Sequence, residues 1–219
     1  MKNIIIIGAS GHSKVIVDAL EKMEKWNIIG YVDSFKKEKE FFGYPILGTE
    51  ESLPKIIRIY DIFGGVIAIG DNFVRFKMVK KIEEQIPDFK FISAIHPKAI
   101  LGRGVQIGDG TVVMAGVVIN SDTTIGEHSI INSSSTIEHD STIGNFSTIA
   151  PNVSMGGGVK IGNFSTISIG AIIKHLIQID DNVLVGANSL VLNNVEKNSV
   201  VYGTPTKLVR KREIYDKYL

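Results

Sequence analysis

A histidine between two carboxylates offers acid–base chemistry: Glu138, His139 and Asp140 directly follow Ile137. An imidazole titrates near neutral pH, and a neighbouring carboxylate can hold the ring in one orientation. The group therefore has the parts of a general base and its orienting partner. The same run could equally form a solvated corner of mixed charge, and the residues alone leave both interpretations open.

A glycine loop near the N-terminus offers a different chemistry, the binding of phosphate. Gly8 and Gly11 follow an apolar run and precede an amphipathic stretch, so backbone N–H groups would gather at a helix N-terminus. Ser10 and the serine at position 13 break the full three-glycine dinucleotide fingerprint, and the loop could merely permit a tight turn. Asp33 ends the next apolar run, where an acidic residue can bind a ribose hydroxyl.

The element that must position His139 is identified by a period of six residues. Sixteen aliphatic residues lie six positions apart from Leu101 to Val191, and small or β-branched residues lie two positions before each of them. This period is typical of a hexapeptide β-helix. An Ile-Gly pair also recurs every eighteen residues from Ile107 to Ile161. The two periods predict a triangular parallel β-helix over residues 99–195, with three strands per coil and aliphatic side chains stacked inward.

The β-helix would place glycines beside the histidine. Gly157 lies one coil beyond His139, flanked by Gly156 and Gly158, so that a ligand could meet bare backbone N–H groups there. The three glycines could also simply tighten a corner. His175 lies two coils beyond His139, roughly 10 Å away at the usual strand spacing, which is too far for a hydrogen bond.

The N-terminal part of the chain has a different period. Apolar runs predict strands over residues 4–7, 28–32, 65–69 and 89–92, and amphipathic stretches predict helices over 14–25 and 73–85. Strands that alternate with helices indicate a small Rossmann-like parallel α/β sheet. We therefore expect a Rossmann-like domain over 1–94, a β-helix domain over 95–206, and a charged tail over 207–219 that is a short helix or a frayed end.

Composition excludes several classes of protein. The net charge of +1 over 219 residues gives no electrostatic case for binding nucleic acid or an anionic membrane. The chain has no cysteine, hence no disulfide framework or thiolate metal site, and we expect a cytoplasmic protein. The apolar run at 4–7 is too short for a signal sequence or a membrane span. A nicotinamide dehydrogenase is disfavoured, because β-helix replaces the second half of a dinucleotide fold.

The motifs together resemble a known family, the hexapeptide-repeat sugar O- and N-acyltransferases. The likeness is to nucleotide-aminosugar N-acetyltransferases of bacillosamine or perosamine type and to sialic acid O-acetyltransferase. It is carried by Gly8-Ala9-Ser10-Gly11-His12, Ile69-Gly70-Asp71-Asn72 with Arg75, Ile95-His96-Pro97, Asn132-Ser133-Ser134-Ser135, Ile137-Glu138-His139-Asp140 and Gly203-Thr204-Pro205-Thr206-Lys207. The resemblance implies a left-handed β-helix and a homotrimer, with acetyl-CoA between adjacent β-helices.

The resemblance also implies roles for particular residues. His139 would be the general base, Asp140 would orient and polarise it, and Asn132 would help position the acceptor or the histidine. The backbone N–H near Gly157 would hold the thioester oxygen, and Gly203 and Pro205 would close on acetyl-CoA. The nucleotide sugar would be bound by Gly8, Ser10, Gly11, His12, Asp33, Gly70, Asn72 and Arg75. No metal is expected. Thr148 stands where some members of the family have a further histidine.

The favoured function is N-acetylation of a nucleotide-linked 4-amino-4,6-dideoxy sugar for surface glycan synthesis. Gly11-His12 resembles the aminosugar N-acetyltransferases, whereas the ending at Gly203-Thr204-Pro205-Thr206 is close to the O-acetyltransferase type. Sialic acid O-acetylation is therefore the alternative within the family.

Two alternatives belong to other classes. A metal-dependent carbonic anhydrase needs three converging histidines, and the β-helix offers only His128, His139 and His175 at unsuitable spacings. A non-catalytic sugar-nucleotide-binding protein would keep the pocket and would not depend on His139.

Overall fold

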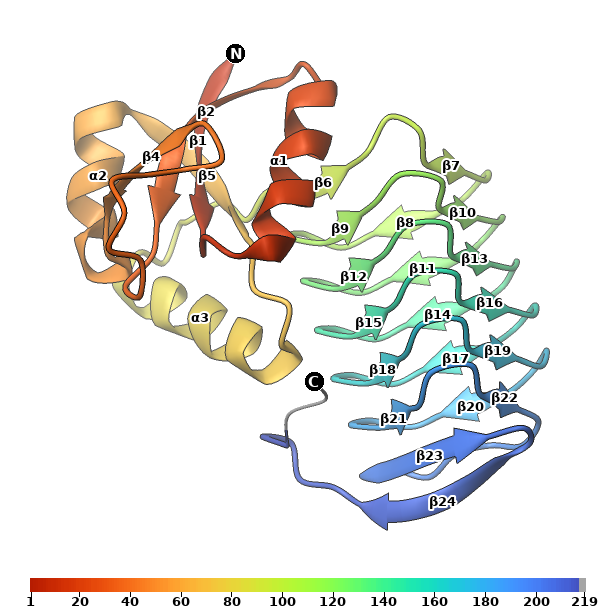
Figure 1. Ribbon diagram of the computed structural model, residues 1–219. Coiled ribbons are helices and arrows are strands. Elements are labelled where there is room, and N and C mark those ends of the chain that lie inside the picture. The colour runs from red at the N-terminus through yellow and green to blue at the C-terminus, as the bar shows by residue number, and fades with distance from the viewer. Residues whose placement is uncertain (217–219) are drawn as a thin grey trace.

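The computed structural model describes residues 1–216 and has two parts that lie side by side (Figure 1). The first part is an α/β domain that ends with α3, and the second is a prism of short strands. This arrangement confirms the predicted fold class, a Rossmann-like domain followed by a left-handed parallel β-helix.

A five-stranded sheet organises the α/β domain, in the order β3-β4-β2-β1-β5. Its elements are β1 (Lys2–Ile7), α1 (Gly11–Lys22), β2 (Trp26–Val32), β3 (Glu40–Phe41), β4 (Tyr44–Gly48), a 3-10 turn (Glu50–Ser52), α2 (Leu53–Tyr60), β5 (Ile62–Ile67) and α3 (Asn72–Gln85). Ile4 and Ile6 pack with α1 on one face, and Ile5 and Ile7 pack with α2 and α3 on the other. Both faces of β1 are thus covered, which is why its sequence is a continuous apolar run.

The sequence predicted this sheet with errors at its edges. The third predicted strand is β5, which begins three residues earlier than expected and ends at Ile67. The strand predicted over residues 89–92 is wrong: Phe91 forms only an isolated bridge with Gly65. Neither α2 nor the β3–β4 hairpin was predicted, because strands of two and five residues and an eight-residue helix show too little periodicity.

Three sheets form the sides of the prism, with orders β22-β19-β16-β13-β10-β7, β20-β17-β14-β11-β8 and β24-β23-β21-β18-β15-β12-β9-β6. All their strands are parallel except β24, which pairs antiparallel with β23. The coil strands are β6 (Ala94–Ile95), β7 (Ile100–Leu101), β8 (Gln106–Ile107), β9 (Val112–Val113), β10 (Val118–Ile119), β11 (Thr124–Ile125), β12 (Ile130–Ile131), β13 (Thr136–Ile137), β14 (Thr142–Ile143), β15 (Thr148–Ile149), β16 (Ser154–Met155), β17 (Lys160–Ile161), β18 (Thr166–Ile167), β19 (Ile172–Ile173), β20 (Gln178–Ile179), β21 (Leu184–Val185) and β22 (Leu190–Val191).

The coil repeat is eighteen residues, as predicted. Ile119 pairs with Ile137, and Ile137 pairs with Met155. The inward aliphatic positions from Val113 to Val191 are all buried, whereas Leu101 at the open end of the prism is 42% exposed. The stacked aliphatic side chains therefore make a continuous core from the second coil onward.

Each corner of the β-helix has two different requirements, a lack of space for a side chain at one position and a positive φ at another. The glycine directly after the aliphatic residue, such as Gly144, has no space for a side chain: a Cβ there would lie 2.6 Å from the backbone nitrogen of Asn163. The positive φ angles lie two residues later, and several are adopted by non-glycine residues, including His128, Asp140 and Phe146. The sequence prediction located the tight corners but did not separate these two requirements.

The C-terminal prediction needs correction. The charged segment expected to be a helix or frayed end forms β24 (Thr206–Lys211), which pairs antiparallel with β23 (Ser199–Gly203). Because β23 extends the eight-stranded sheet, the hairpin closes the end of the prism. Residues 217–219 of the predicted tail lie outside the described part of the chain, and the domain boundaries stay predictions.

Candidate active site

The corner between β13 and β14 presents His139 and Asp140 to solvent. Nδ1 of His139 lies 2.7 Å from Oδ2 of Asp140, and their side chains are 63% and 68% exposed. This hydrogen bond is the main cause of a raised pKa for His139. Asp140 adopts a positive φ of 57° at this corner, a conformation that aspartate tolerates. The pair therefore has the geometry of a base and its orienting carboxylate.

The neighbouring Glu138 is held by the preceding coil instead. Its Oε2 accepts a hydrogen bond of 2.9 Å from Nδ2 of Asn120, which occupies the equivalent position one coil earlier. Glu138 is thus turned away from the pairing with His139. Sequence reasoning did not identify Asn120, although its spacing of eighteen residues from Glu138 was a usable signal.

Gly157 leaves a slot beside the histidine ring. A Cβ at this position would lie 2.8 Å from both Cε1 and Nε2 of His139, closer than real side chains approach. The coils are locked together here, because the backbone N–H of Gly158 donates to the His139 carbonyl at 2.8 Å. Among the described residues, none accepts a hydrogen bond from the backbone N–H of Gly157.

The predicted nucleotide-binding loops meet at the carboxyl ends of β1 and β5. A Cβ at Gly8 would contact the carbonyl oxygen of Ala68 at 3.3 Å, and Ser10 Oγ donates to the same carbonyl at 3.4 Å. Strand order reverses between β1 and β5, and such switch points bind ligands in open α/β sheets. The structure therefore brings Gly8, Ser10, Gly11 and Gly70 to one edge.

Asp33 shapes this edge with its carboxylate. Oδ2 accepts a hydrogen bond of 2.7 Å from the Ala9 backbone, and Oδ1 accepts hydrogen bonds from the Phe35 and Lys36 backbones. Ala9, Ser10 and Asp33 line an open cavity of about 560 Å³, with Phe35 93% exposed at its rim. The Asp33 carboxylate thus holds the loop that forms the cavity wall, which the sequence did not predict. Its binding of a ribose hydroxyl stays a prediction.

His12 lies at the inner side of α1. Burial, and secondarily the charge of Arg75, lower its pKa to about 4, so the ring is neutral at physiological pH. Its Nε2 atom is buried and makes no hydrogen bond within the described part of the chain.

Asn72 and Arg75 differ from the other predicted nucleotide-binding residues. Both are buried, with exposures of 6% and 1%, and both bond to the β-helix. Thr148, which sequence reasoning noted only for a missing histidine, donates to Asn72 Oδ1 at 2.7 Å. These residues occupy the boundary between the two domains.

Asn132 lies at a different corner from His139. It follows β12, and its Nδ2 donates to the Ile149 carbonyl at 3.1 Å. It lines a cavity of about 460 Å³ together with Thr148, Thr166 and mainly apolar residues. Asn132 and His139 thus flank the two ends of β13, and one chain does not bring them together.

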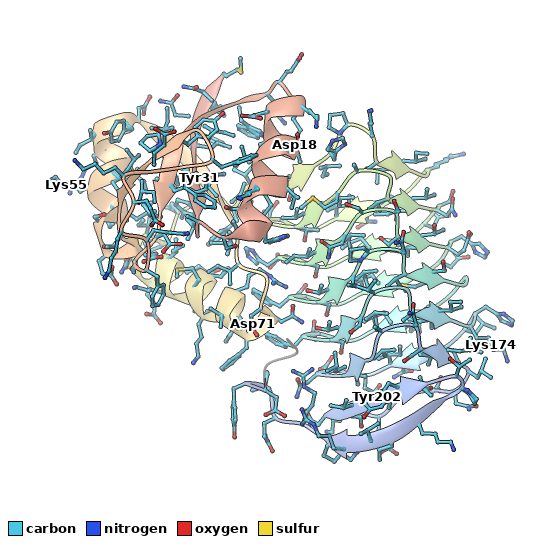
Figure 2. The ribbon with its side chains drawn as sticks, viewed as in Figure 1. Asp18, Tyr31, Lys55, Asp71, Lys174 and Tyr202 are labelled. Carbon is cyan, nitrogen blue, oxygen red and sulfur yellow. The ribbon has the colours of Figure 1, made fainter. Side chains whose placement is uncertain are left out.

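The His139 corner also lies far from the nucleotide edge. Lys174 follows β19 as Glu138 follows β13, so it lies in the same column of corners as His139. In Figure 2, Lys174 lies on the side of the β-helix away from Tyr31 and Asp71 of the α/β domain. The predicted groups therefore form two separate surfaces of one chain.

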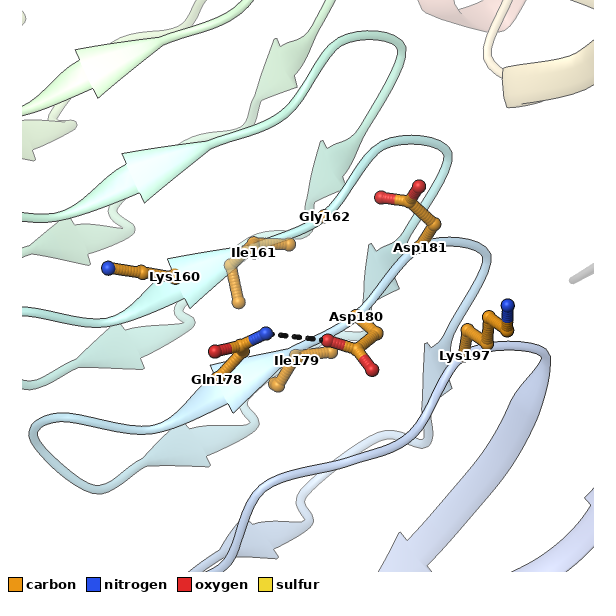
Figure 3. Close-up of a pocket in the computed structure, with 8 residues that line it drawn as sticks. All are labelled: Lys160, Ile161, Gly162, Gln178, Ile179, Asp180, Asp181 and Lys197. Carbon is orange, nitrogen blue, oxygen red and sulfur yellow. Dashed lines mark hydrogen bonds between the residues drawn. The ribbon is translucent and has the colours of Figure 1, made fainter.

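The predicted acetyl-CoA-binding residues Gly203 and Pro205, and a further cavity, lie toward the C-terminus. Gly203 and Pro205 form the turn between β23 and β24, where the Gly203 backbone donates to Ser189 Oγ at 3.1 Å. A further cavity of about 410 Å³ lies beside β17 and β20 of the β-helix (Figure 3) and is lined by Lys160, Gln178, Asp181 and Lys197 among others. It contains none of the predicted site residues.

The histidines do not converge. His128 is buried at the domain boundary, whereas His139 is exposed at another corner, and within residues 1–216 no cluster of three or more potential metal ligands occurs. In the same range no helix has the length and apolar character needed to cross a membrane.

Two family models match the chain. Residues 3–82 match the PglD N-terminal domain, and residues 104–139 and 122–157 match the bacterial transferase hexapeptide repeats. Among curated proteins, UDP-N-acetylbacillosamine N-acetyltransferase from Bacillus subtilis is 31% identical over 119 residues. That match covers 52% of this chain and 52% of the relative, so the matched segment is about half of each protein's length.

Solved structures match almost the whole chain. A mutant of perosamine N-acetyltransferase from Caulobacter crescentus, in complex with CoA and GDP-perosamine, is 30% identical with a TM-score of 0.90. The match covers 96% of this chain and 98% of that one. The acetyltransferase domain of PglB from Neisseria gonorrhoeae, in complex with acetyl coenzyme A, is 26% identical with a TM-score of 0.88, covering 95% and 99%.

Proposed function

This chain belongs to the hexapeptide-repeat sugar acyltransferase family, and we propose that it is an acetyl-CoA-dependent N-acetyltransferase of a nucleotide-linked 4-amino-4,6-dideoxy sugar. The single observation that carries the proposal is the exposed His139–Asp140 pair beside the open slot at Gly157. The relatives that bind CoA with GDP-perosamine, or acetyl coenzyme A alone, support the choice of both substrates.

His139 would act through Nε2. Asp140 accepts the hydrogen bond from Nδ1–H, which leaves the Nε2 lone pair free to take a proton from the attacking amine. The amine nitrogen forms a bond to the thioester carbon, and the carbon–sulfur bond then breaks. The proton held by His139 passes to the departing CoA thiolate, so the histidine is restored. Direct transfer needs no covalent enzyme intermediate when both substrates are aligned.

Gly157 would stabilise the oxygen that becomes negative during the attack. Its backbone N–H has no acceptor among the described residues, and the absent side chain lets the thioester lie against the His139 ring. Loss of one such donor typically costs about 3 kcal/mol of transition-state stabilisation.

The complete site would form between two chains of a homotrimer. Nucleotide-binding loops and the His139 corner lie on opposite sides of one chain, so a sugar held by one chain would meet His139 of a neighbour. Exposed apolar residues on the β-helix, including Ile169, Ile172 and Leu176, offer surface for such packing. Acetyl-CoA would then lie between adjacent β-helices, with Gly203 and Pro205 near it.

The setting that we propose is surface glycan synthesis in the cytoplasm. Nucleotide sugars and acetyl-CoA would both be supplied there, and the cysteine-free composition agrees with a reducing compartment.

Thiol release from acetyl-CoA tests the proposal. The acceptors would be UDP-, GDP- and dTDP-linked 4-aminosugars, with CMP-sialic acid and free sialic acid as oxygen acceptors. We expect turnover on one aminosugar that is lost in His139→Ala. Turnover on sialic acid alone would replace the proposal with O-acetylation, and thiol release on no acceptor would favour a sugar-nucleotide-binding protein.

A further inference from the structure

The first turn of α3 is bonded to the β-helix by two buried side chains. Arg75 Nε donates to the His128 carbonyl at 2.8 Å, and Nη2 donates to the Phe146 carbonyl at 3.2 Å. Asn72 Nδ2 donates to Thr166 Oγ1 at 3.0 Å, while its Oδ1 accepts from Thr148 Oγ1 at 2.7 Å. Arg75 Nη2 also donates to Asn72 Oδ1 at 2.8 Å, so the two residues act as one connected unit.

An aromatic column supports the same contact. His128, Phe146 and Phe164 occupy equivalent corner positions in successive coils and stack with centroid separations of 5.1 and 5.4 Å. Phe76 of α3 packs edge-on against both phenylalanines at 5.3 and 5.4 Å. Ring contacts of this kind add to burial, and they leave little freedom for α3 to slide along the column.

The unit extends from the nucleotide edge to the cavity that Asn132 lines. On one side, Arg75 Nη1 donates to the Ile69 and Gly70 carbonyls at 2.9 and 2.7 Å, in the loop at the nucleotide edge. On the other side, Thr148 precedes Ile149, whose carbonyl accepts from Asn132. The bonded residues therefore extend from the predicted sugar-nucleotide loop to the cavity that Asn132 lines.

We infer that Asn72, Arg75 and Thr148 are positioning residues, which fix the sugar-nucleotide loop relative to the β-helix, rather than groups that contact substrate. The inference rests on the proposed function for its catalytic consequence. Transfer between two separately bound substrates depends on their alignment, and a misplacement of about 1 Å can cost a hundredfold in rate. Both substrates would still bind to their own surfaces if the alignment were lost.

Kinetics with matched variants provide the first test. Asn72→Ala should lower kcat about tenfold to a hundredfold, while the Kd values for nucleotide sugar and for CoA, each measured alone, change less than about threefold. Thr148→Val replaces the hydroxyl with a methyl group, which cannot donate to Asn72, and should lower kcat several-fold, whereas Thr148→Ser should restore it. Glu84→Ala, on the exposed side of the same helix, is the control and should match the parent.

Two outcomes with these variants would overturn the inference. A large rise in the Kd for nucleotide sugar at unchanged kcat would make Asn72 a direct ligand. A lower melting temperature with unchanged kcat per folded molecule would mean that Asn72, Arg75 and Thr148 only stabilise the fold.

A distance measurement tests the inference without any activity. Because the chain has no cysteine, Lys55→Cys and Lys174→Cys would carry spin labels only at those exposed positions, which lie at opposite ends of the molecule (Figure 2). Labelled chains diluted into unlabelled protein isolate the distance within one chain. We expect one narrow distribution that broadens or shifts with Asn72→Ala, and an unchanged distribution would contradict the inference. Absence of thiol release would instead contradict the proposed function alone.

Discussion

Two corners of the β-helix, at His128 and at His139, give the same residue opposite properties. His139 is exposed, hydrogen-bonded to Asp140, and has a raised pKa. His128 is 4% exposed, lies edge-on against Phe91, and stacks on Phe146. Burial, and then the charge of Arg75, lower its pKa to about 4.

The repeat therefore does not assign a role to a polar residue at its corners. Both histidines follow an inward isoleucine by two or three positions. What differs is the neighbour in space: α3 covers the column that contains His128, whereas His139 and Asp140 remain exposed in the described part of the chain. A corner becomes available for chemistry where the rest of the chain leaves it open.

Matched substitutions of the two histidines should give the largest effects and should affect different quantities, kcat in one case and stability in the other. His139→Asn should lower kcat about 10²- to 10⁴-fold with an unchanged melting temperature, because general-base catalysis is removed at an exposed site. His128→Asn should keep kcat per folded molecule but lower the free energy of unfolding by about 1–3 kcal/mol, because a stacked ring is lost. Thiol release and denaturant titration measure the two effects, and an equal loss of activity in both variants would contradict the division of roles.

The slot beside His139 provides a smaller effect. In Gly157→Ala the added methyl would meet the imidazole ring, so the ring must move, and kcat should fall about tenfold to a hundredfold. A double-mutant cycle supplies the control: in the His139→Ala background, where the ring is absent, Gly157→Ala should add little. Additive losses would mean that Gly157 acts independently of His139.

Asp140 should govern the pH dependence of the reaction. Its hydrogen bond raises the His139 pKa, so more of the base is protonated at low pH than in its absence. Asp140→Asn should therefore move the acid limb of kcat/KM to lower pH, and the plateau should fall on the order of tenfold because the ring is less well oriented. The full pH–rate profile is the measurement, and an unmoved acid limb would refute the assignment.

The buried histidines should make the fold sensitive to acid. The folded-state pKa values of His128 and His12 lie near 4, below the ordinary value of 6.5, so the unfolded chain binds protons first as pH falls. Stability should therefore be full above about 6.5 and decline toward about 4. The urea midpoint of unfolding, measured across this pH range, should decline less for His128→Asn than for the parent protein. The decline that remains in the variant would come from His12 and other groups.

Sequence reasoning recovered the fold because regular periods report burial directly. The six-residue spacing of Ile119, Ile125 and Ile131 fixed which side chains enter the core. The four isoleucines before Gly8 fixed a strand buried on both faces. The β3–β4 hairpin, α2 and β24 were missed or wrong, since short or charged elements depend on neighbours that no local pattern shows.

For the candidate site, the eighteen-residue coil alone predicted that Gly157 lies beside His139. Adjacency offered both Glu138 and Asp140 as partners of His139, the family resemblance selected Asp140, and the structure shows Asp140 hydrogen-bonded to the ring. Only the tertiary structure decided that Asn132 and His139 lie at different corners, and that Asn72 and Arg75 are buried between the domains. The physical reason is that a repeat specifies the neighbours of a residue within the β-helix. It does not specify which corner the α/β domain will cover, and that choice depends on side-chain packing between segments about fifty to ninety residues apart.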